Sequence, residues 1–448
     1  MTEKKDMQND LFEKAPVHKA YFKFALPVVF SMVISLIYNM VDTYFIARTG
    51  NTNLVAGVSI CAPVFMLMIA IGDIFGLGGS SVISRLFGQK RDDDGKRLSV
   101  FCFYGALFCG ILFTAMMLLF RRAVLSLLGA DAETFAYASQ YFTYLVLGAP
   151  FIIVSYTPSN QLRTEGLTNE SMIGTILGAV VNMILDPIFI SALGLGAAGA
   201  AIATVIGNIC ADLFFVCILL TKSKWLSVSP AGFYITSAEV GQIMAIGIPA
   251  SITNLMQSFG TALTNRYLLP YGNDKVAAMG IVMKVNLIAV LVLVGFAFGA
   301  QPLIGYNYGA DNKARLRKIL RFSYAFECGI AVMLAGILSL AAPVMIRMFM
   351  SDESVIAAGV PMLRMQQIGM AFIAVVLVTT CTFQSAGKAV GAFLLSVSRQ
   401  GVVFAAVIFI ASKLFGYSGV LLAQAVSDVL TAILAVGLFW GGLRKELK

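Results

Sequence analysis

The sequence predicts an all-α membrane protein of twelve transmembrane helices, arranged as two pseudo-symmetric lobes of six helices. Three observations predict this fold. Of the 448 residues, 59% are hydrophobic and 12% are charged, and the mean hydropathy is +0.86, whereas a soluble domain carries about 25% charged residues. Apolar runs of the roughly 20 residues needed to cross a bilayer recur along the whole chain. The second half also matches the first at an offset of about 221 residues.

The apolar runs divide evenly between the two halves. We expect spans at about 22–47, 54–86, 98–120, 136–162, 171–193, 197–220, 241–268, 276–305, 318–341, 361–384, 400–413 with its flanks, and 418–441. The predicted organisation is an amino-terminal segment 1–20, a first lobe 21–220, a linker 221–240, a second lobe 241–441 and a tail 442–448. In the polar linker, Thr236 and Glu239 have the spacing of a capping box, which predicts the start of the seventh helix.

The internal repeat keeps a constant register over a whole half-chain. Pro27 corresponds to Pro249, and each lies inside an apolar helix. GNTNLVA from residue 50 matches GNDKVAA from residue 272, and FGQKRDDDGKRL from residue 87 matches YGADNKARL from residue 308. Asp131 matches Asp352 in the same register. Such self-similarity is typical of membrane proteins built from two related bundles.

The charge pattern predicts the topology. The net charge is +9, and the basic residues gather in the loops on one side of the membrane. The positive-inside rule therefore places both termini in the cytoplasm. We expect a multi-pass protein of the plasma or inner membrane. A nucleic-acid partner is not expected. The segment 1–20 is polar, which predicts no cleavable signal peptide. The seven cysteines fall inside spans without a zinc or redox spacing, which favours ordinary packing.

Ionisable side chains inside spans are the main functional signal, because each costs about 2.5–3.5 kcal/mol on insertion scales unless it has a partner or a purpose. The candidates are Asp42, Asp73, Asp186, Asp212, Lys284, Glu327 and Asp428.

Four polar side chains of the first lobe are predicted at one depth. Asp42 and Asp186 lie close to the outer ends of spans one and five, Asn182 lies one turn deeper, and Thr204 lies near the start of span six. At about 1.5 Å per residue, they cluster roughly 8–16 Å below the outer surface. The set suits an oxygen cage for a hard cation such as Na⁺ or an acid pair that binds and releases a proton. Alternatively, each acid makes only a helix–helix hydrogen bond.

The repeat distinguishes these alternatives. The second-lobe counterparts of Asp42, Asn182, Asp186 and Thr204 are Thr264, Val403, Val407 and Gln424. The second lobe has no equivalent acid pair, so a structural need common to both halves cannot explain the first lobe's cluster. This difference favours a functional site.

Weaker candidates line the expected cleft between the lobes. Asp73 and Lys284 lie on corresponding spans, two and eight, where an ion pair, a substrate contact and isolated water-facing positions all remain open. Neutral polar and flexible apolar candidates for a substrate cavity are Asn254, Met256, Gln257 and Met283. For Asp212, Glu327 and Asp428 we expect cavity-facing or interface-facing positions. Gly76, Gly78 and Gly79 on span two, and Gly295 and Gly299 on span eight, are expected to allow close helix packing.

At these residues the chain resembles the multidrug and toxic compound extrusion (MATE) family over about residues 20–440. The resemblance is carried by Pro27 with NMVDTYFIA in span one, the FGQKRDDDGKR loop, the LRTEG turn, NMILDPIF in span five and GLGAAGAAIATVI in span six. It implies a V-shaped pair of lobes around a cavity that opens alternately to each side. It also implies an amino-lobe cation site of Asp42, Asn182, Asp186 and Thr204, with Ala200 at a backbone-carbonyl position. Some members carry an essential acid on span seven, where this chain has Gln257, which argues against a carboxy-lobe cation site.

The resemblance implies a secondary antiporter rather than an enzyme. We expect a monomer without a cofactor that exports lipophilic organic cations in exchange for H⁺ or Na⁺, with the coupling ion left open. The alternative is a flippase for lipid-linked precursors, which would need a strongly basic cavity for a pyrophosphate, and only Lys284 is placed for that role. The sequence has no metal, nucleophile or cofactor motif that would indicate a membrane-embedded enzyme.

Overall fold

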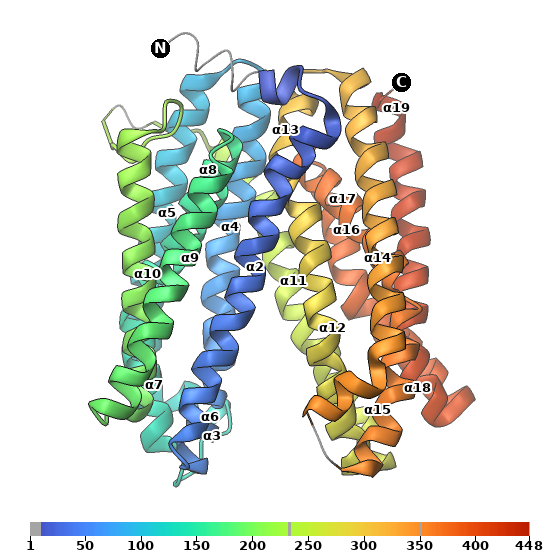
Figure 1. Cartoon of the computed structure of the whole chain (residues 1–448). Coiled ribbons are helices and arrows are strands. Elements are labelled where there is room, and N and C mark those ends of the chain that lie inside the picture. The colour runs from blue at the N-terminus through green and yellow to red at the C-terminus, as the bar shows by residue number, and fades with distance from the viewer. Residues whose placement is uncertain (1–9, 232–233, 350–351, 448) are drawn as a thin grey trace. The chain divides into compact units, whose positions relative to one another are not determined.

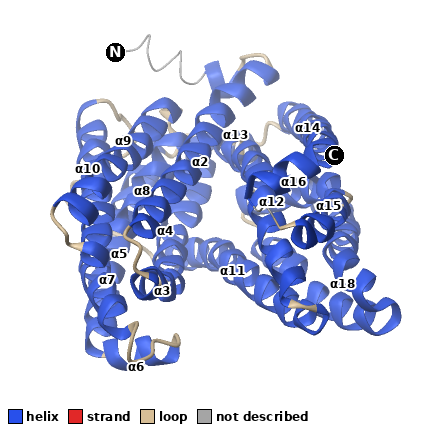
Figure 2. Ribbon diagram, turned by 60° about the horizontal axis from the view of Figure 1, so that its bottom comes forward, coloured by secondary structure: helices blue, strands red, loops and turns tan. Residues whose placement is uncertain are grey.

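The computed structural model describes residues 10–231, 234–349 and 352–447, and these residues form helices and turns without a strand (Figure 2). The all-α prediction is confirmed. The helices of the amino-terminal half are α2 Val17–Arg48, α3 Thr52–Ile60, α4 Ala62–Gly88, α5 Asp92–Leu119, α6 Arg121–Leu127, α7 Phe135–Leu147, α8 Ala149–Thr164, α9 Thr168–Asp186, the π-helix Pro187–Ala192 and α10 Gly196–Thr221.

The carboxy-terminal half follows the same order of elements. Its helices are α11 Ser237–Leu268, the 3₁₀-helix Leu269–Tyr271, α12 Asn273–Gly299, α13 Gln301–Gly309, α14 Lys313–Phe349, α15 Glu353–Gln367, α16 Met370–Ser385, α17 Ala389–Val397, the π-helix Ser398–Val402, α18 Val403–Leu438, the π-helix Phe439–Leu443 and α19 Arg444–Leu447. Each predicted span coincides with one or more of these helices.

Within the described residues, eight helices are long and apolar enough to cross a membrane, and two bent pairs raise the number to ten. Two features explain the difference from the expected twelve. The helix α11 carries polar residues such as Asn254 and Gln257 along its length and falls outside this set. The stretch Ala389–Leu443 is counted once although its 55 residues would extend about 80 Å as a straight helix, more than twice the roughly 30 Å hydrocarbon core.

This last stretch reverses direction between the two predicted spans that it contains. Gly416 has φ 55° and ψ −128°, a backbone conformation that a side chain would oppose. A Cβ on Gly419 would lie 1.9 Å from the carbonyl oxygen of Ala411, so the two arms pass in direct contact. The spans at 400–413 and 418–441 are therefore two arms of one helical hairpin.

The chain divides by contacts into two compact units, Phe30–Ser251 and Met1–Val29 with Ile252–Lys448. Both boundaries fall inside helices, shortly after Pro27 in α2 and shortly after Pro249 in α11. In each unit the helices pack side by side as a bundle (Figure 1). The first helix of each repeat is therefore shared, with its amino-terminal part in one unit and the rest in the other. This division follows contacts, whereas the predicted lobes follow the repeat, and the two cut the chain at different places.

Glycines on spans two and eight allow these shared helices to pack closely, as predicted. A Cβ on Gly295 would lie 2.8 Å from the Cα of Val29, and one on Gly299 would lie 2.5 Å from the Cα of Ala25. In the other unit, a Cβ on Gly78 would lie 2.5 Å from the carbonyl oxygen of Ile243. These distances leave no room for a side chain. The backbone of α2 therefore contacts that of α12, and the backbone of α11 contacts that of α4.

The linker is fixed at both of its ends. The Thr236 N–H donates to Glu239 Oε2 at 2.9 Å and the Glu239 N–H donates to Thr236 Oγ1 at 3.3 Å, which confirms the predicted capping box. At the other end, the buried Glu165 carboxylate accepts the Ser223 hydroxyl at 2.5 Å and the Lys224 N–H at 2.6 Å. Burial raises the pKa of the Glu165 carboxyl, and these hydrogen bonds oppose part of that rise.

Candidate functional site

Three of the predicted cation-site residues meet where α9 packs against α10. Asn182 Nδ2 donates to Asp186 Oδ1 at 3.4 Å and to Thr204 Oγ1 at 3.3 Å. The Thr204 hydroxyl donates to the carbonyl oxygen of Ala200 at 3.1 Å. Because Asn182 and Asp186 are one helical turn apart on α9, both face the same stretch of α10. Asn182, Asp186, Thr204 and the Ala200 carbonyl therefore form one hydrogen-bonded cluster, and no hydrogen bond in it involves Asp42.

The local sequence explains this close approach. A Cβ on Gly207 would lie 2.6 Å from the carbonyl oxygen of Gly178, and a Cβ on Gly178 would lie 2.9 Å from that of Gly207. These two glycines bring α9 and α10 into backbone contact one turn from Asn182. The α-helix ends at Asp186, and the π-helical turn that starts at Pro187 widens the backbone beside the carboxylate. Such turns are frequent at functional sites.

The cluster is buried but incompletely hydrogen-bonded. Asp186 is 0% exposed, Asn182 is 2% exposed and Thr204 is 6% exposed. The half-buried Asp42, on α2, lies within charge–charge range of Asp186. Asp42 Oδ1, Asn182 Oδ1 and Asp186 Oδ2 are all buried without a hydrogen-bond partner among the described residues. Buried polar atoms are rarely left unpaired, so three acceptor oxygens at one place indicate a site that a cation or protons would complete.

The donor set defines which cation fits. Two carboxylates, an amide oxygen and a hydroxyl are hard oxygen ligands, which suit Na⁺ better than a thiolate-seeking or imidazole-seeking metal. Among the described residues, no group of three or more His, Cys, Asp and Glu side chains is arranged to hold a metal ion. Two like-charged carboxylates in one buried site also favour the uptake of a proton.

The corresponding positions of the second half make a different arrangement. The Thr264 hydroxyl donates to the carbonyl oxygen of Gly260 in its own helix at 2.9 Å. Gln424 Nε2 donates to Asp428 Oδ1 at 3.1 Å, and Arg399 Nε donates to the same oxygen at 3.1 Å. Asp428, which we expected to face an interface, forms an ion pair with Arg399 across the contact between α18 and the preceding π-helix.

Sequence reasoning missed two basic residues. Arg399 lies in the flank of the eleventh apolar run, and Arg163 lies at the end of the fourth. Arg163 Nε donates to Ser171 Oγ at 3.1 Å, and its guanidinium lies within charge–charge range of Asp73. A search for basic as well as acidic residues at the edges of spans would have found both.

The predicted cavity residues belong to both contact units. Asp73 lies in one unit, and Lys284, which is exposed, lies in the other. The remaining candidates are also in the second of these units: Asn254 and Met256 are half-buried, Gln257 is exposed, and Met283 packs against the apolar core around α12 and α15. Their assignment to one substrate cavity stays a prediction. Asp212 is buried, and both its carboxylate oxygens lack a hydrogen-bond partner among the described residues.

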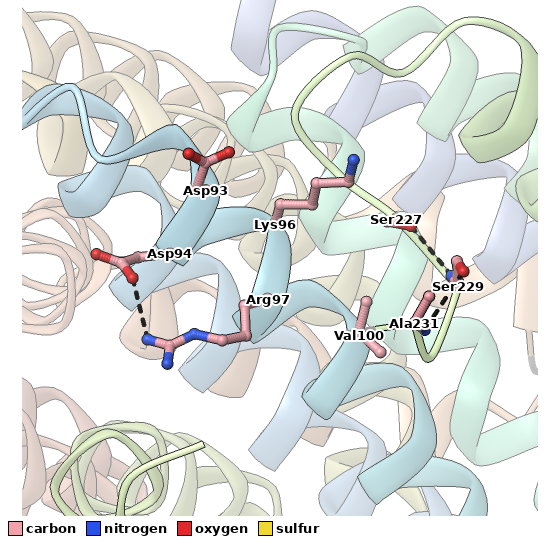
Figure 3. A pocket seen from close by; sticks show the side chains of 8 residues that line it. All are labelled: Asp93, Asp94, Lys96, Arg97, Val100, Ser227, Ser229 and Ala231. Carbon is pink, nitrogen blue, oxygen red and sulfur yellow. Dashed lines mark hydrogen bonds and ion pairs between the residues drawn. The ribbon is translucent and has the colours of Figure 1, made fainter. Parts of the chain in front are cut away.

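A separate pocket of about 490 Å³ lies between the first turns of α5 and the linker (Figure 3). It holds none of the predicted site residues. Its lining is Asp93, Asp94, Lys96, Arg97, Val100, Ser227, Ser229 and Ala231. Arg97 pairs with Asp94 at 3.0 Å and with Glu239 of the capping box, so these charges fasten the linker to α5.

Comparison with known proteins places the chain in a family. The MatE family model matches it twice, over residues 27–188 and 249–410, so the two matches begin at the corresponding prolines Pro27 and Pro249. The chain belongs to the MatE family. The repeat and the family resemblance predicted from the sequence are thereby confirmed, and the chain is a multi-pass membrane protein of this family.

Relatives of known name cover nearly the whole chain. It is 31% identical to the multidrug export protein MepA of Staphylococcus aureus (strain MRSA252) over 96% of this chain and 95% of that protein. MepA of Staphylococcus saprophyticus is 30% identical over the same shares. Among solved structures, an outward-facing multidrug resistance MATE family transporter of the MOP superfamily superposes with a TM-score of 0.91 at 25% identity, with 97% of each chain covered. A MOP superfamily transporter from Pyrococcus furiosus gives a TM-score of 0.90 at 25% identity and the same coverage.

Proposed function

We propose that this MatE-family protein is a multidrug efflux antiporter that exports lipophilic organic cations in exchange for H⁺ or Na⁺. The observation that carries the proposal is the oxygen cluster of buried Asn182, Asp186 and Thr204 with half-buried Asp42, which is incompletely hydrogen-bonded and absent from the second half. The names of the staphylococcal relatives, which are multidrug export proteins, support the same assignment.

In this proposal the cation is the driving ligand. One elementary charge that crosses 100 mV provides about 2.3 kcal/mol, which sustains a substrate gradient of about 50-fold. The cation binds the unpaired oxygens near Asp186 from one side of the membrane and is released on the other, and no further cofactor is needed. The protein lies in the plasma or inner membrane with both termini on the cytoplasmic side. Asp42 is then near the outer end of α2, where cations can enter the site down an inward gradient. The protein acts as a monomer on small molecules in the bilayer.

The test is efflux of a fluorescent cationic dye from proteoliposomes with sodium and pH gradients imposed separately. One gradient alone should drive efflux by the wild-type protein, which identifies the coupling ion. Asp42→Asn and Asp186→Asn should each lower cation-driven efflux at least about 100-fold, since each removes a charge that the cation needs.

The matched control is Asp93→Asn, which makes the same substitution at an exposed residue in the first turn of α5. It should retain full efflux. Unchanged cation dependence in both site variants, with normal thermal unfolding, would contradict the proposed site. Selective binding of a pyrophosphate lipid instead of cationic dyes would indicate the flippase.

A further inference from the structure

A second buried carboxyl lies in the unit formed by the start of α2 and the carboxy-terminal half. Glu327, on α14, is 0% exposed. Tyr21 Oη, in the first turns of α2, lies at hydrogen-bond distance, 3.1 Å, from Glu327 Oε1. Glu327 Oε2 is buried without a hydrogen-bond partner among the described residues. An ionised carboxylate accepts up to about four hydrogen bonds, so this site is poorly built for a permanent negative charge.

Aromatic rings pack around Tyr21, the hydrogen-bond partner of this carboxyl. The ring of Phe326 lies 4.9 Å from those of Phe22 and Phe296, and the ring of Tyr21 lies 5.2 Å from that of Phe322. These rings come from α2, α12 and α14, so the apolar surroundings are built by three helices rather than by one.

The groups recorded near the carboxyl carry no positive charge. The titratable groups that face Glu327 are Tyr21 from α2, Cys381 from α16, and Tyr324 and Cys328 of its own helix. The helix α12 contributes the ring and the carbonyl of Phe296. Within the described part of the chain, no lysine, arginine or histidine forms an ion pair with Glu327. A lone carboxylate is unfavourable in such surroundings, which makes Glu327 a candidate for holding a proton.

The hydrogen-bond chain accommodates that proton. Tyr21 Oη also lies 3.4 Å from the carbonyl oxygen of Phe296. When Glu327 is protonated, its O–H donates to Tyr21 Oη and the Tyr21 hydroxyl donates to the Phe296 carbonyl. When a water molecule accepts the proton and leaves as hydronium, the Tyr21 hydroxyl turns to donate to the carboxylate. Proton binding and release therefore require only the reversal of one hydrogen bond and access for water.

The position of this site along α2 indicates the side of the membrane with which it exchanges a proton. Tyr21 lies in the first turns of α2, which begins at Val17, whereas Asp42 lies in its last turns before Arg48. The two residues are 21 positions apart (42 − 21), which is about 30 Å along the helix contour and close to the thickness of the hydrocarbon core. The amino-terminal part of α2 that carries Tyr21 packs on the α12 glycines. Glu327 is thus in contact with the amino-terminal part of α2, through Tyr21.

We propose that Glu327 and Tyr21 form a second proton-binding site, which exchanges its proton on the side of the membrane where the amino terminus lies. Exchange occurs when the amino-terminal part of α2 moves away from α14 and water reaches the carboxyl. The site goes beyond the proposed function, because it does not depend on the cluster between α9 and α10 or on the identity of the coupling ion there.

Infrared spectroscopy of the purified full-length protein in lipid tests this site directly. The background is the triple variant Asp42→Asn, Asp186→Asn, Asp212→Asn, which removes the acids of the first site and the buried Asp212. Near neutral pH this protein should absorb in the carbonyl-stretch region of an un-ionised carboxylic acid, and the absorption should disappear as the pH rises. Adding Glu327→Gln should remove the band, and adding Tyr21→Phe should shift its frequency, because that change deletes the hydrogen bond and leaves the ring.

The matched control is Glu353→Gln, an exposed glutamate of the same unit, which should leave the band unchanged. A band that survives Glu327→Gln, or one that stays constant over the whole pH range at which the protein is folded, would overturn the proposal. If Glu327→Gln fails to fold, the frequency shift of Tyr21→Phe decides, and an unshifted band overturns the site.

A transport measurement separates this site from the first one. Glu327→Gln in otherwise wild-type protein should reduce the change of the efflux rate with pH at least about tenfold. The affinity for the dye should stay the same. An unchanged pH profile in Glu327→Gln, beside the loss of efflux in Asp42→Asn, would overturn the second site and leave the proposed function intact.

Discussion

The contact between spans five and six is built with opposite chemistry in the two halves of the molecule. In the first half, Gly178 and Gly207 bring α9 and α10 together, and oxygens of Asn182 and Asp186 beside them have no partner in the part of the chain that the structure describes. In the second half, Arg399 occupies the position that corresponds to Gly178 in the repeat, and its guanidinium pairs with the buried Asp428. A carboxylate that the protein itself neutralises needs no ion from solution. Under the proposed function, a cation from solution takes in the first half the role that Arg399 has in the second half.

Where the halves agree, they build the same scaffold. Asp131 accepts the Thr134 hydroxyl at 2.7 Å and the Thr134 N–H at 2.9 Å. Its counterpart Asp352 accepts the Ser354 hydroxyl at 2.7 Å and the Ser354 N–H at 2.8 Å. The bent pairs α7–α8 and α15–α16 also match, with bends of 49° and 46° at equivalent glycine-containing junctions.

The largest effect is expected from removing the built-in cation. Arg399→Met leaves Asp428, which is 1% exposed, as an unpaired buried charge, and this should lower the free energy of unfolding by about 3–5 kcal/mol. The double variant Arg399→Met, Asp428→Asn should recover most of the loss, because no charge remains buried. Thermal unfolding in detergent measures both. An equal loss in the single and double variants would show that the ion pair is not what stabilises this contact.

A smaller effect should follow from supplying the missing cation to the first half. The coupling cation at about 100 times its dissociation constant should stabilise the folded protein by about 2.7 kcal/mol. Unfolding curves with Na⁺ against a large inert cation, and at different pH values, measure this stabilisation. Asp186→Asn should abolish it and Asp428→Asn should retain it. If Asp428→Asn abolished the stabilisation and Asp186→Asn retained it, the cation would bind in the second half and not in the first.

The glycine contact should be next in size. A Cβ in Gly207→Ala would lie 2.6 Å from the Gly178 carbonyl oxygen and 3.2 Å from the Cβ of Asn182, so it pushes the helices apart at a cost of about 1–3 kcal/mol. Cation-driven efflux should fall more than dye binding, because Asn182 moves away from Thr204. Gly280→Ala is the matched control, since nothing lies within 4 Å of its Cβ. Equal behaviour of the two variants would argue against a packing role for Gly207.

The smallest effect is expected where the halves agree. Asp131→Ala and Asp352→Ala should each destabilise the protein slightly and to the same degree. Hydrogen bonds from Thr134 and Ser354 hold the pKa of these exposed carboxyls below 3.8. Each contribution is therefore present above about pH 4 and is lost as the pH falls through the lowered pKa of the folded state. Unfolding at about pH 6 and about pH 3 measures it, and a marked inequality between the two variants would weaken the scaffold interpretation.

Much of the fold could be predicted because bilayer crossing and helix initiation are local properties. The apolar runs, the capping box at Thr236 and the glycine contacts follow from residues close in sequence or from helical period. The spacing of Asn182 and Asp186 likewise places both on one face of α9. Depth counting then put Thr204 beside them, and the hydrogen bonds of Asn182 confirm that meeting.

Periodicity and counting along a helix predicted the spans, the repeat and the common depth of Asn182, Asp186 and Thr204. The partners of the remaining charges came from the folded chain: Arg399 for Asp428, Arg163 near Asp73 and Tyr21 for Glu327. These partners are far apart in sequence, and helical period fixes which face a residue occupies but not which helix meets it. The division of α2 and α11 between the two units is decided in the same way, by backbone contacts at glycines on other helices.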